Sequence, residues 1–172
     1  MLRVAVLGGT GYLASIIKSQ NNLKKYKYSF FSRKKKSENY IDYLNFENNI
    51  KILKKFDTII YLVGPNKNQI KKKKNLINVK NDITIKICNF CKNYNIKLIY
   101  ISSLQVYKNY GIDDISLNSK INLDNLYAKS HYETEKIILK LFKKNKNIFT
   151  ILRLGNVFGF NENINSNKFY NN

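Results

Sequence analysis

The sequence predicts a single α/β domain built on a doubly wound parallel sheet. Short apolar, β-branched runs recur along the chain, segments with helical spacing of apolar residues separate them, and glycines or serines follow several runs where they end. Strands that alternate with helices favour a parallel sheet with right-handed crossovers. The 172 residues suffice for one domain with a buried core. We expect this domain over residues 1–160 and a frayed tail over 161–172.

The first half of the chain contains three expected strands. LRVAVLG is a β-branched strand that ends at Gly8, and YLASIIKSQ after it has helical spacing. KYSFFSR is the second strand, followed by lysines and a poorly patterned stretch to about residue 46. ENNIKILKKF carries its apolar residues on one face and predicts a helix. DTIIYLVG is a buried strand that Gly64 and Pro65 close.

The second half continues the alternation of helices and strands. Residues 75–93 form a long expected helix, and IKLIYISS is a strand with two serines at its end. Residues 125–145 predict a helix whose lysine-rich end suits the helix dipole. NIFTILRLGNVFG is a further strand with a glycine exit.

The chain is strongly basic, with 31 Lys and Arg against 11 Asp and Glu and a net charge of +20. Such a charge suggests nucleic acid, an anionic membrane or another polyanion as a partner. Bidentate recognition of phosphates and bases favours arginine over lysine. Here only Arg3, Arg33 and Arg153 are arginine, and the other basic residues are lysine. We therefore expect a solvated basic surface without a specific nucleic-acid site. No run reaches the roughly 18 apolar residues of a membrane span, so we expect a cytoplasmic protein.

Cys88 and Cys91 form a C-x-x-C pair in ICNFCKNY. A redox dithiol or half of a zinc site is one interpretation, but there is no second pair and His131 is the only histidine. Two small buried side chains on one helical face are the interpretation that we favour. We expect no metal site.

The residues Gly8, Gly11 and Ala14 have the spacing G-x-x-G-x-x-[G/A] between the first expected strand and helix. One glycine allows the tight turn, another lets the backbone approach a pyrophosphate, and a small third residue lets the helix pack on the strand. The motif predicts a dinucleotide site with Tyr12 and Leu13 beside the cofactor. An ordinary tight turn is the alternative that this motif leaves open.

Five segments together are more specific than the glycine motif: GGTGYLA at 8–14, DTIIYLVG at 57–64, ISSLQVY at 101–107, LYAKSHYETEK at 126–136 and LRLGNVFG at 152–159. Their order and spacing resemble the extended short-chain dehydrogenase/reductase family, the NAD-dependent epimerase/dehydratase group that acts on nucleotide sugars. The resemblance implies a Rossmann-like fold, NAD or NADP as cofactor, a nucleotide-sugar substrate and a homodimer formed through long helices. In the family, the substrate lobe is built mainly from sequence beyond the last of these segments. The resemblance therefore implies that this chain corresponds to the family's cofactor-binding part.

The family pairs a serine or threonine at the end of the fifth strand with Tyr-x-x-x-Lys on the next helix. The resemblance assigns these positions to Ser103 and Tyr127. It implies that Tyr127 removes a proton from a sugar hydroxyl while hydride passes to the nicotinamide, and that Ser103 hydrogen-bonds the same oxygen. His131 occupies the position of the family's lysine. An imidazole is mostly neutral near pH 7, so we expect a weaker electrostatic effect on Tyr127.

A literal Tyr-x-x-x-Lys also occurs, at Tyr132 and Lys136. The small Ala128 and Ser130 that follow Tyr127, and Glu135 eight residues after it, match the family's register only if Tyr127 is the reacting tyrosine. Tyr132 lies five residues later, about 140° around a helix. We therefore predict that Tyr127 is the acid/base.

The residue after the second strand distinguishes the two dinucleotides, because an acid there binds a ribose 2′-hydroxyl and a base accommodates a 2′-phosphate. Arg33 stands there with no acid nearby, which favours NADP over NAD. By the resemblance, Leu62, Val63 and Gly64 line the dinucleotide. Two other functions stay open: a noncatalytic dinucleotide-binding protein, and a basic nucleic-acid binder whose affinity would depend on salt.

Overall fold

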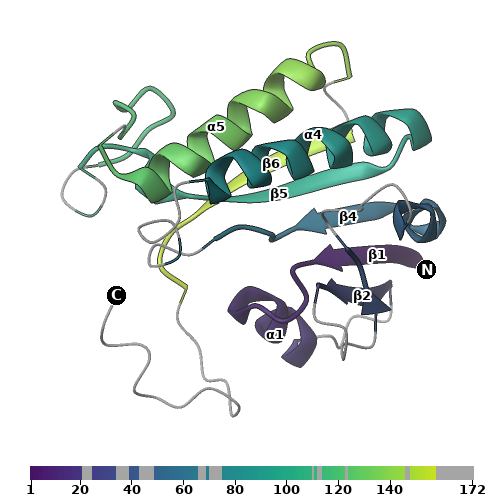
Figure 1. Cartoon of the computed structure of the whole chain (residues 1–172). Coiled ribbons are helices and arrows are strands. Elements are labelled where there is room, and N and C mark those ends of the chain that lie inside the picture. The colour runs from purple at the N-terminus through teal and green to yellow at the C-terminus, as the bar shows by residue number, and fades with distance from the viewer. Residues whose placement is uncertain are drawn as a thin grey trace.

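Figure 1 shows the computed structural model of the chain, in which six parallel strands form one sheet. The strand order is β3-β2-β1-β4-β5-β6. The chain starts in the middle of the sheet, runs to one edge, returns beside β1 and runs to the other edge, so the predicted Rossmann-like α/β fold is confirmed. The structure describes residues 1–20, 25–33, 39–42, 49–65, 69, 75–109, 111, 114–122, 124–145 and 148–157.

The described elements follow the predicted alternation along the chain. The strands are β1 (Leu2–Leu7), β2 (Tyr26–Ser32), β3 (Asn39–Tyr40), β4 (Thr58–Tyr61), β5 (Lys97–Ser103) and β6 (Phe149–Leu154). The helices are α1 (Tyr12–Ser19), α4 (Leu76–Tyr94) and α5 (Leu126–Leu141), with short 3₁₀ helices η1 (Ile50–Lys55) and η2 (Leu104–Val106). The tail expected at 161–172 lies outside the described residues, and the domain boundary at residue 160 stays a prediction.

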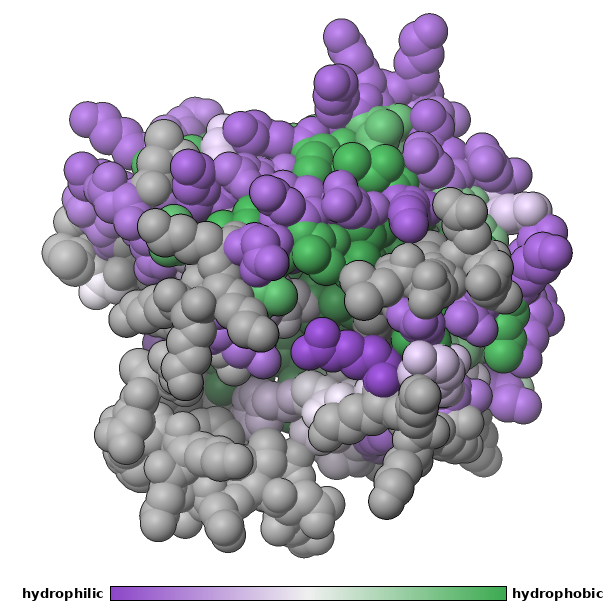
Figure 2. All heavy atoms as spheres, in the orientation of Figure 1, coloured by the Kyte–Doolittle hydropathy of each residue, from purple (hydrophilic) through white to green (hydrophobic). Residues whose placement is uncertain are grey.

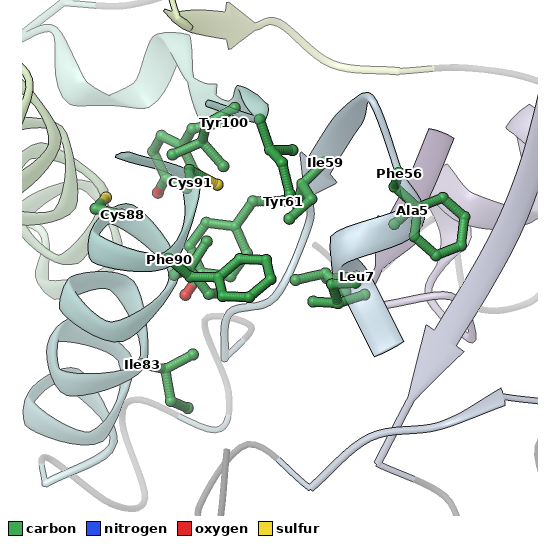
Figure 3. Close-up of a cluster of buried hydrophobic side chains, with 14 of the residues drawn as sticks. Ala5, Leu7, Phe56, Ile59, Tyr61, Ile83, Cys88, Phe90, Cys91 and Tyr100 are labelled. Atoms are coloured by element: carbon green, nitrogen blue, oxygen red, sulfur yellow. The ribbon is translucent and has the colours of Figure 1, made fainter. Parts of the chain in front are cut away.

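The sheet separates two layers of apolar side chains, because successive residues of a strand point to opposite faces. Ala5 and Leu7 of β1 belong to the larger core, which α4 and α5 cover. Val4 and Val6 pack with Ala14 of α1 on the other face. Figure 3 shows side chains of β1, β4 and β5 meeting those of α4 in the larger core. This packing holds the carboxyl ends of the central strands at one edge of the sheet.

Two elements differ from the expectation. The predicted α-helix near residues 47–56 is the 3₁₀ helix η1. Ile50, Leu53 and Phe56 all pack into the larger core, and their spacing of three residues fits 3.0 residues per turn better than 3.6. The short edge strand β3 was not predicted, since it consists of two residues in a stretch without apolar periodicity.

The described surface is mainly hydrophilic. Figure 2 shows hydrophilic residues over most of the described face that Figure 1 presents, with an apolar area among them. Ile85 of α4 and Leu139 of α5 are among the large apolar side chains exposed to solvent. No helix within the described residues combines the length and apolar character that a membrane crossing requires.

Candidate functional site

The turn after β1 brings the backbone against two neighbouring strands. Gly8 has a φ of +97°, which favours glycine, and a Cβ there would lie 3.1 Å from Leu62. At Gly9, a Cβ would lie 2.8 Å from the Cβ of Phe30. The N–H groups of Gly8 and Gly9 both donate to the carbonyl of Phe31, at 3.0 and 2.8 Å. The turn therefore requires glycine at two adjacent positions, of which the sequence motif had singled out the first.

Helix α1 begins at this turn with an open N-terminus. Its N-cap is Gly11, which has no side chain to accept from the N–H groups of the first turn, and that turn contains no acidic residue. The N–H of Gly11 donates to the carbonyl of Gly8 at 2.9 Å, which holds the turn in place. The first N–H groups of a helix have no intrahelical acceptors and lie at the positive end of its dipole. Such a helix start can bind a diphosphate.

A cleft of about 560 Å³ opens where β1, β4, β5 and β6 end. It brings together every predicted site residue except Arg33, which is exposed after β2. These lining residues are Gly8, Gly11, Tyr12, Leu13, Leu62, Val63, Gly64, Ser103, Tyr127 and His131. Ala14 of the predicted glycine motif also lines the cleft, and further residues of the cleft were not predicted: Pro65, Ile101, Ser102, Gln105, Leu154, Gly155, Asn156 and Val157. The glycine exit of the last strand was the available signal for the final four.

Ser103 and Tyr127 come together because β5 ends beside the start of α5. The side chain of Asn125 caps α5 by accepting from the N–H groups of Tyr127, at 2.9 Å, and of Ala128, at 3.4 Å. Tyr127 therefore lies in the first helical turn, facing the end of the strand. Burial raises the pKa of Tyr127 above its usual value, and a hydrogen bond with the Ser103 side chain opposes this effect. The side chains of Ser103 and Tyr127 therefore meet in the cleft.

The second Tyr-x-x-x-Lys pair lies elsewhere on the same helix. The ammonium of Lys136 sits 5.2 Å from the ring centroid of Tyr132, a cation–π contact within α5. Neither residue lines the cleft. The geometry thus separates Tyr127, in the cleft, from Tyr132, outside it.

His131 lies one helical turn after Tyr127 and packs against it. The two rings meet edge to face, with centroids 4.6 Å apart. Burial, together with the charge of Lys80, lowers the pKa of His131 well below its usual value of 6.5. The imidazole is therefore neutral at pH 7 and adds no positive charge to the cleft.

Behind His131 lie two residues that the sequence analysis missed. The hydroxyl of Tyr100 is 2.7 Å from Nδ1 of His131, and the ammonium of Lys80 donates to the same hydroxyl at 3.1 Å. Lys80 is only 3% exposed. Burial lowers its pKa from 10.5 to about 7, against the opposing effect of the Glu135 and Glu133 carboxylates.

The signal for Lys80 was its helical register. It shares the buried face of α4 with Ile77, Ile83, Thr84 and Ile87, at the spacing of an amphipathic helix. A lysine on such a face stands out in most sequences. Among 31 Lys and Arg residues, it does not.

A buried carboxylate ties the carboxyl-terminal strands to α5. Glu135 accepts two hydrogen bonds from Arg153, at 2.9 and 2.5 Å, and one from the Ser102 hydroxyl at 2.5 Å. Arg153 also donates to the Tyr107 hydroxyl and lies over its ring. The Ser102 hydroxyl is therefore engaged with Glu135.

The C-x-x-C pair belongs to the core. Cys88 and Cys91 have free, fully buried thiols on α4 and contribute to the larger core cluster. Burial raises the pKa of Cys88 to about 12 and that of Cys91 further. Within the described part of the chain, no three His, Cys, Asp or Glu residues are grouped so as to hold a metal ion.

Three solved structures illustrate how similar the fold of this chain is to that of known proteins. UDP-N-acetylglucosamine 4-epimerase from Bacillus cereus is 22% identical, with a TM-score of 0.72 over 95% of this chain and 57% of that one. UDP-glucuronic acid 4-epimerase from Bacillus cereus in complex with NAD is 18% identical, with a TM-score of 0.72 over 92% and 58%. dTDP-4-dehydrorhamnose reductase from Bacillus anthracis in complex with NADP is 21% identical, with a TM-score of 0.73 over 90% and 54%.

The likeness to these structures shows a shared fold, and the chain spans only a little over half the length of each. No curated protein sequence matches the chain. The family comparison extends further, since residues 4–172 match one family in a single alignment. That match includes the glycine turn, the end of β5 and the start of α5. The chain belongs to the NAD dependent epimerase/dehydratase family.

Proposed function

We propose that this chain forms the cofactor-binding part of an NAD(P)-dependent epimerase, dehydratase or reductase that acts on a nucleotide sugar. One observation carries the proposal: a single cleft joins an open helix start, suited to a diphosphate, with a serine and tyrosine pair suited to proton transfer. Membership of the NAD dependent epimerase/dehydratase family supports it. The names of the similar structures, which include UDP-sugar epimerases, support the substrate class.

The residues present fit a nicotinamide dinucleotide. Gly8 and Gly11 leave the turn without side chains, and the start of α1 is uncapped and free of acids. Leu62, Val63 and Gly64 would line the middle of the cofactor at the end of β4. When bound, the nicotinamide would supply hydride acceptance and return.

The acid/base work would fall to Tyr127. Its hydroxyl would take the proton of a sugar hydroxyl and give it back, and the Ser103 hydroxyl would hold the same oxygen in place. An ordinary tyrosine has a pKa of about 10, and burial raises that of Tyr127 further. The site therefore needs a positive charge near the phenolate, because an opposite charge favours the ionised form.

The adenosine end would favour NADP. Ser32 closes β2 and lies 3.3 Å from the Thr10 hydroxyl, and the exposed Arg33 follows it. A guanidinium at this position can accommodate a 2′-phosphate.

Cofactor binding is the first test. Calorimetric titration should detect both dinucleotides, with NADP the tighter, and Arg33→Asp should reverse the order. Gly11→Val should abolish binding of both, because its side chain would fill the space beside the Gly8 carbonyl, 3.3 Å from a Cβ. Ser19→Val, at the far end of α1, is the matched control and should bind normally. Binding unaffected by Gly11→Val would refute the proposed cofactor site.

Turnover is the second test. A panel of UDP- and dTDP-sugars should be incubated with the protein and cofactor, with product sugars separated by chromatography and nicotinamide absorbance recording any net reduction. Tyr127→Phe should lose activity by about 10²-fold or more, the usual contribution of a positioned acid/base. Tyr132→Phe removes a hydroxyl from the same helix outside the cleft and should leave activity unchanged. Equal activity of the two variants would remove Tyr127 from the proposal.

A noncatalytic dinucleotide-binding protein is the second candidate. The neutral His131 beside Tyr127 favours it, since neither residue supplies the charge that a phenolate needs. Cofactor binding without turnover of any nucleotide sugar would select this function.

A further inference from the structure

Lys80 brings a buried ammonium to the back of the cleft. Its Nζ donates to the Tyr100 hydroxyl at 3.1 Å, to the Ser130 hydroxyl at 3.4 Å and to the Ser130 carbonyl at 3.5 Å. Three acceptors match the three hydrogens of a charged ammonium. Neither of the ion pairs found among the described residues includes Lys80. A buried charge without a carboxylate partner is costly, so its position calls for a reason beyond stability.

The hydrogen bonds fix which atom donates at each step. A charged ammonium can only donate, so the Tyr100 oxygen accepts from Lys80. The Thr134 side chain also hydrogen-bonds Tyr100 and lowers its pKa, as a donor to the Tyr100 oxygen does, so with Lys80 and Thr134 both donating, the hydrogen of Tyr100 is left for Nδ1 of His131 at 2.7 Å. Nδ1 is therefore an acceptor. The ring must carry its hydrogen on Nε2, the nitrogen turned away from Tyr100.

The chain of contacts reaches the cleft at two points. His131 lines the cleft and packs on Tyr127, with ring centroids 4.6 Å apart. The ammonium also lies directly behind Gly64, since a Cβ on Gly64 would be 3.7 Å from Nζ of Lys80. Lys80 thus lies behind Gly64 and His131, two residues that line the cleft.

We infer that Lys80 is a positioning residue: acting through Tyr100, it holds His131 as the Nε2–H tautomer and supplies the positive charge behind Tyr127 from helix α4. The inference rests on the proposed function for its catalytic meaning, because it assigns a charge to the acid/base of that reaction. In this arrangement His131 is a neutral donor toward the cleft, and the cation that favours the Tyr127 phenolate comes from another element of the fold.

The surrounding groups leave this charge available. From β5 and β4, the rings of Tyr100 and Tyr61 approach the site, and burial raises the pKa of Tyr100 well above its usual value, so its hydroxyl stays neutral at pH 7. From α5, the carboxylate of Glu135 is engaged by Arg153, and Glu133 acts on Lys80 only from a distance. No carboxylate among the described residues forms an ion pair with this ammonium, and the charged form of Lys80 predominates below its pKa of about 7.

The sole histidine of the chain makes the tautomer directly measurable. In protein labelled with ¹⁵N-histidine, the two ring nitrogens of His131 have well-separated resonances when the ring is neutral. At about pH 6, where Lys80 is charged, the wild type should show one protonated nitrogen, Nε2. Lys80→Met should populate both tautomers, because a neutral Tyr100 hydroxyl can then donate to Nδ1 or accept from it.

Two further variants keep the measurement decisive. Tyr100→Phe leaves Lys80 in place and should also release the tautomer, so it carries the test if Lys80→Met does not fold. Lys92→Met makes the same change at an exposed position of α4 and should give the wild-type spectrum. An unchanged tautomer in the folded Tyr100→Phe or Lys80→Met protein would overturn the inference.

Turnover separates this inference from the proposed function. If the wild type turns over a nucleotide sugar, Lys80→Met should lower kcat by about tenfold or more, with little change in KM. A rise of one unit in the Tyr127 pKa lowers the phenolate population about tenfold. Adding His131→Lys to Lys80→Met should restore activity, because it returns an ammonium beside Tyr127. An active wild type with unchanged activity in Lys80→Met would overturn the inference. An inactive wild type would refute the proposed reaction, and the histidine spectra alone would then decide whether Lys80 positions His131.

Discussion

Replacing Lys80 by methionine should change how the stability of the fold depends on pH. Methionine keeps an unbranched side chain of similar reach and removes the charge. In the unfolded chain a lysine titrates near pH 10.4, whereas burial in the fold lowers the pKa of Lys80 to about 7. Between these values the unfolded chain binds a proton that the folded chain has lost. The free energy of unfolding therefore rises as the pH rises through this window and falls as the pH returns toward 7.

The magnitude follows from the two pKa values. One proton gives a limiting slope of about 1.4 kcal/mol per pH unit. Because half of Lys80 is still charged near pH 7, its contribution between pH 7 and pH 9 integrates to about 2 kcal/mol. The buried thiols act in the opposite direction, since burial raises the pKa of Cys88 to about 12 while an unfolded thiol ionises near 8.5. Both proteins share the thiols, so the difference between wild type and Lys80→Met isolates the lysine.

The assay is urea unfolding followed by circular dichroism at pH 7, 8 and 9. The free energy of unfolding of the wild type, minus that of Lys80→Met, should grow by about 2 kcal/mol over this range. The exposed Lys92→Met control should show a constant difference. Parallel pH profiles for wild type and Lys80→Met would refute the burial of a titrating lysine at this position.

Three other features give measurable expectations. Gly9→Ala should destabilise the fold by about 1–3 kcal/mol in thermal unfolding, because its Cβ would lie 2.8 Å from a side chain of β2, whereas Gly64→Ala, with only ordinary contacts at 3.5 Å, should cost less. Glu135→Ala should cost about 3 kcal/mol, because it leaves a partly buried guanidinium and the Ser102 hydroxyl without their acceptor; a loss under about 0.5 kcal/mol would contradict the network. Cys88 and Cys91 should resist alkylation at pH 8 in the folded protein and react after unfolding, since burial raises the pKa of both thiols.

The sequence predicted the glycine turn because the requirement at Gly8 is local. A left-handed backbone followed by a helix start leaves a spacing that is visible along the chain. The requirement at Gly9 is different in kind. It comes from the approach of the turn to Phe30, a residue of another strand, and no pattern within the motif indicates which strands will be neighbours.

The different surroundings of the two tyrosines were also predictable, and for a physical reason. Five residues along a helix change the direction of a side chain by more than a right angle, so only one tyrosine can face the end of β5. The small residues that follow Tyr127 matched the family's register, and Ala128 and Ser130 are fully buried in the structure. The literal motif at Tyr132 identifies a surface cation–π pair instead.

The distinction between η1 and an α-helix is not visible so clearly in the sequence. Apolar residues at spacings of three and four look alike over one or two turns, and η1 has only six residues. Its form is decided by the core, where Leu53 and Phe56 must both reach the larger cluster. The difference has no consequence for the site, which lies at the other end of the sheet.

The replacement of the family's lysine by His131 takes on a different meaning once Lys80 is included. A comparison of sequences treats His131 as a lost positive charge, because it compares only the residue four positions after the tyrosine on the same helix. The ammonium of Lys80 on α4 instead donates to the Tyr100 hydroxyl, which contacts His131 beside the same tyrosine. Lysine at position 131 would then be incompatible with the same neighbour, since two ammonium groups would meet around Tyr100. His131→Lys by itself should therefore gain little activity, whereas the same change in the Lys80→Met protein should gain most. A charge that has moved from position 131 to Lys80 requires this dependence of one substitution on the other. A motif that has simply lost its lysine predicts the same gain in both backgrounds.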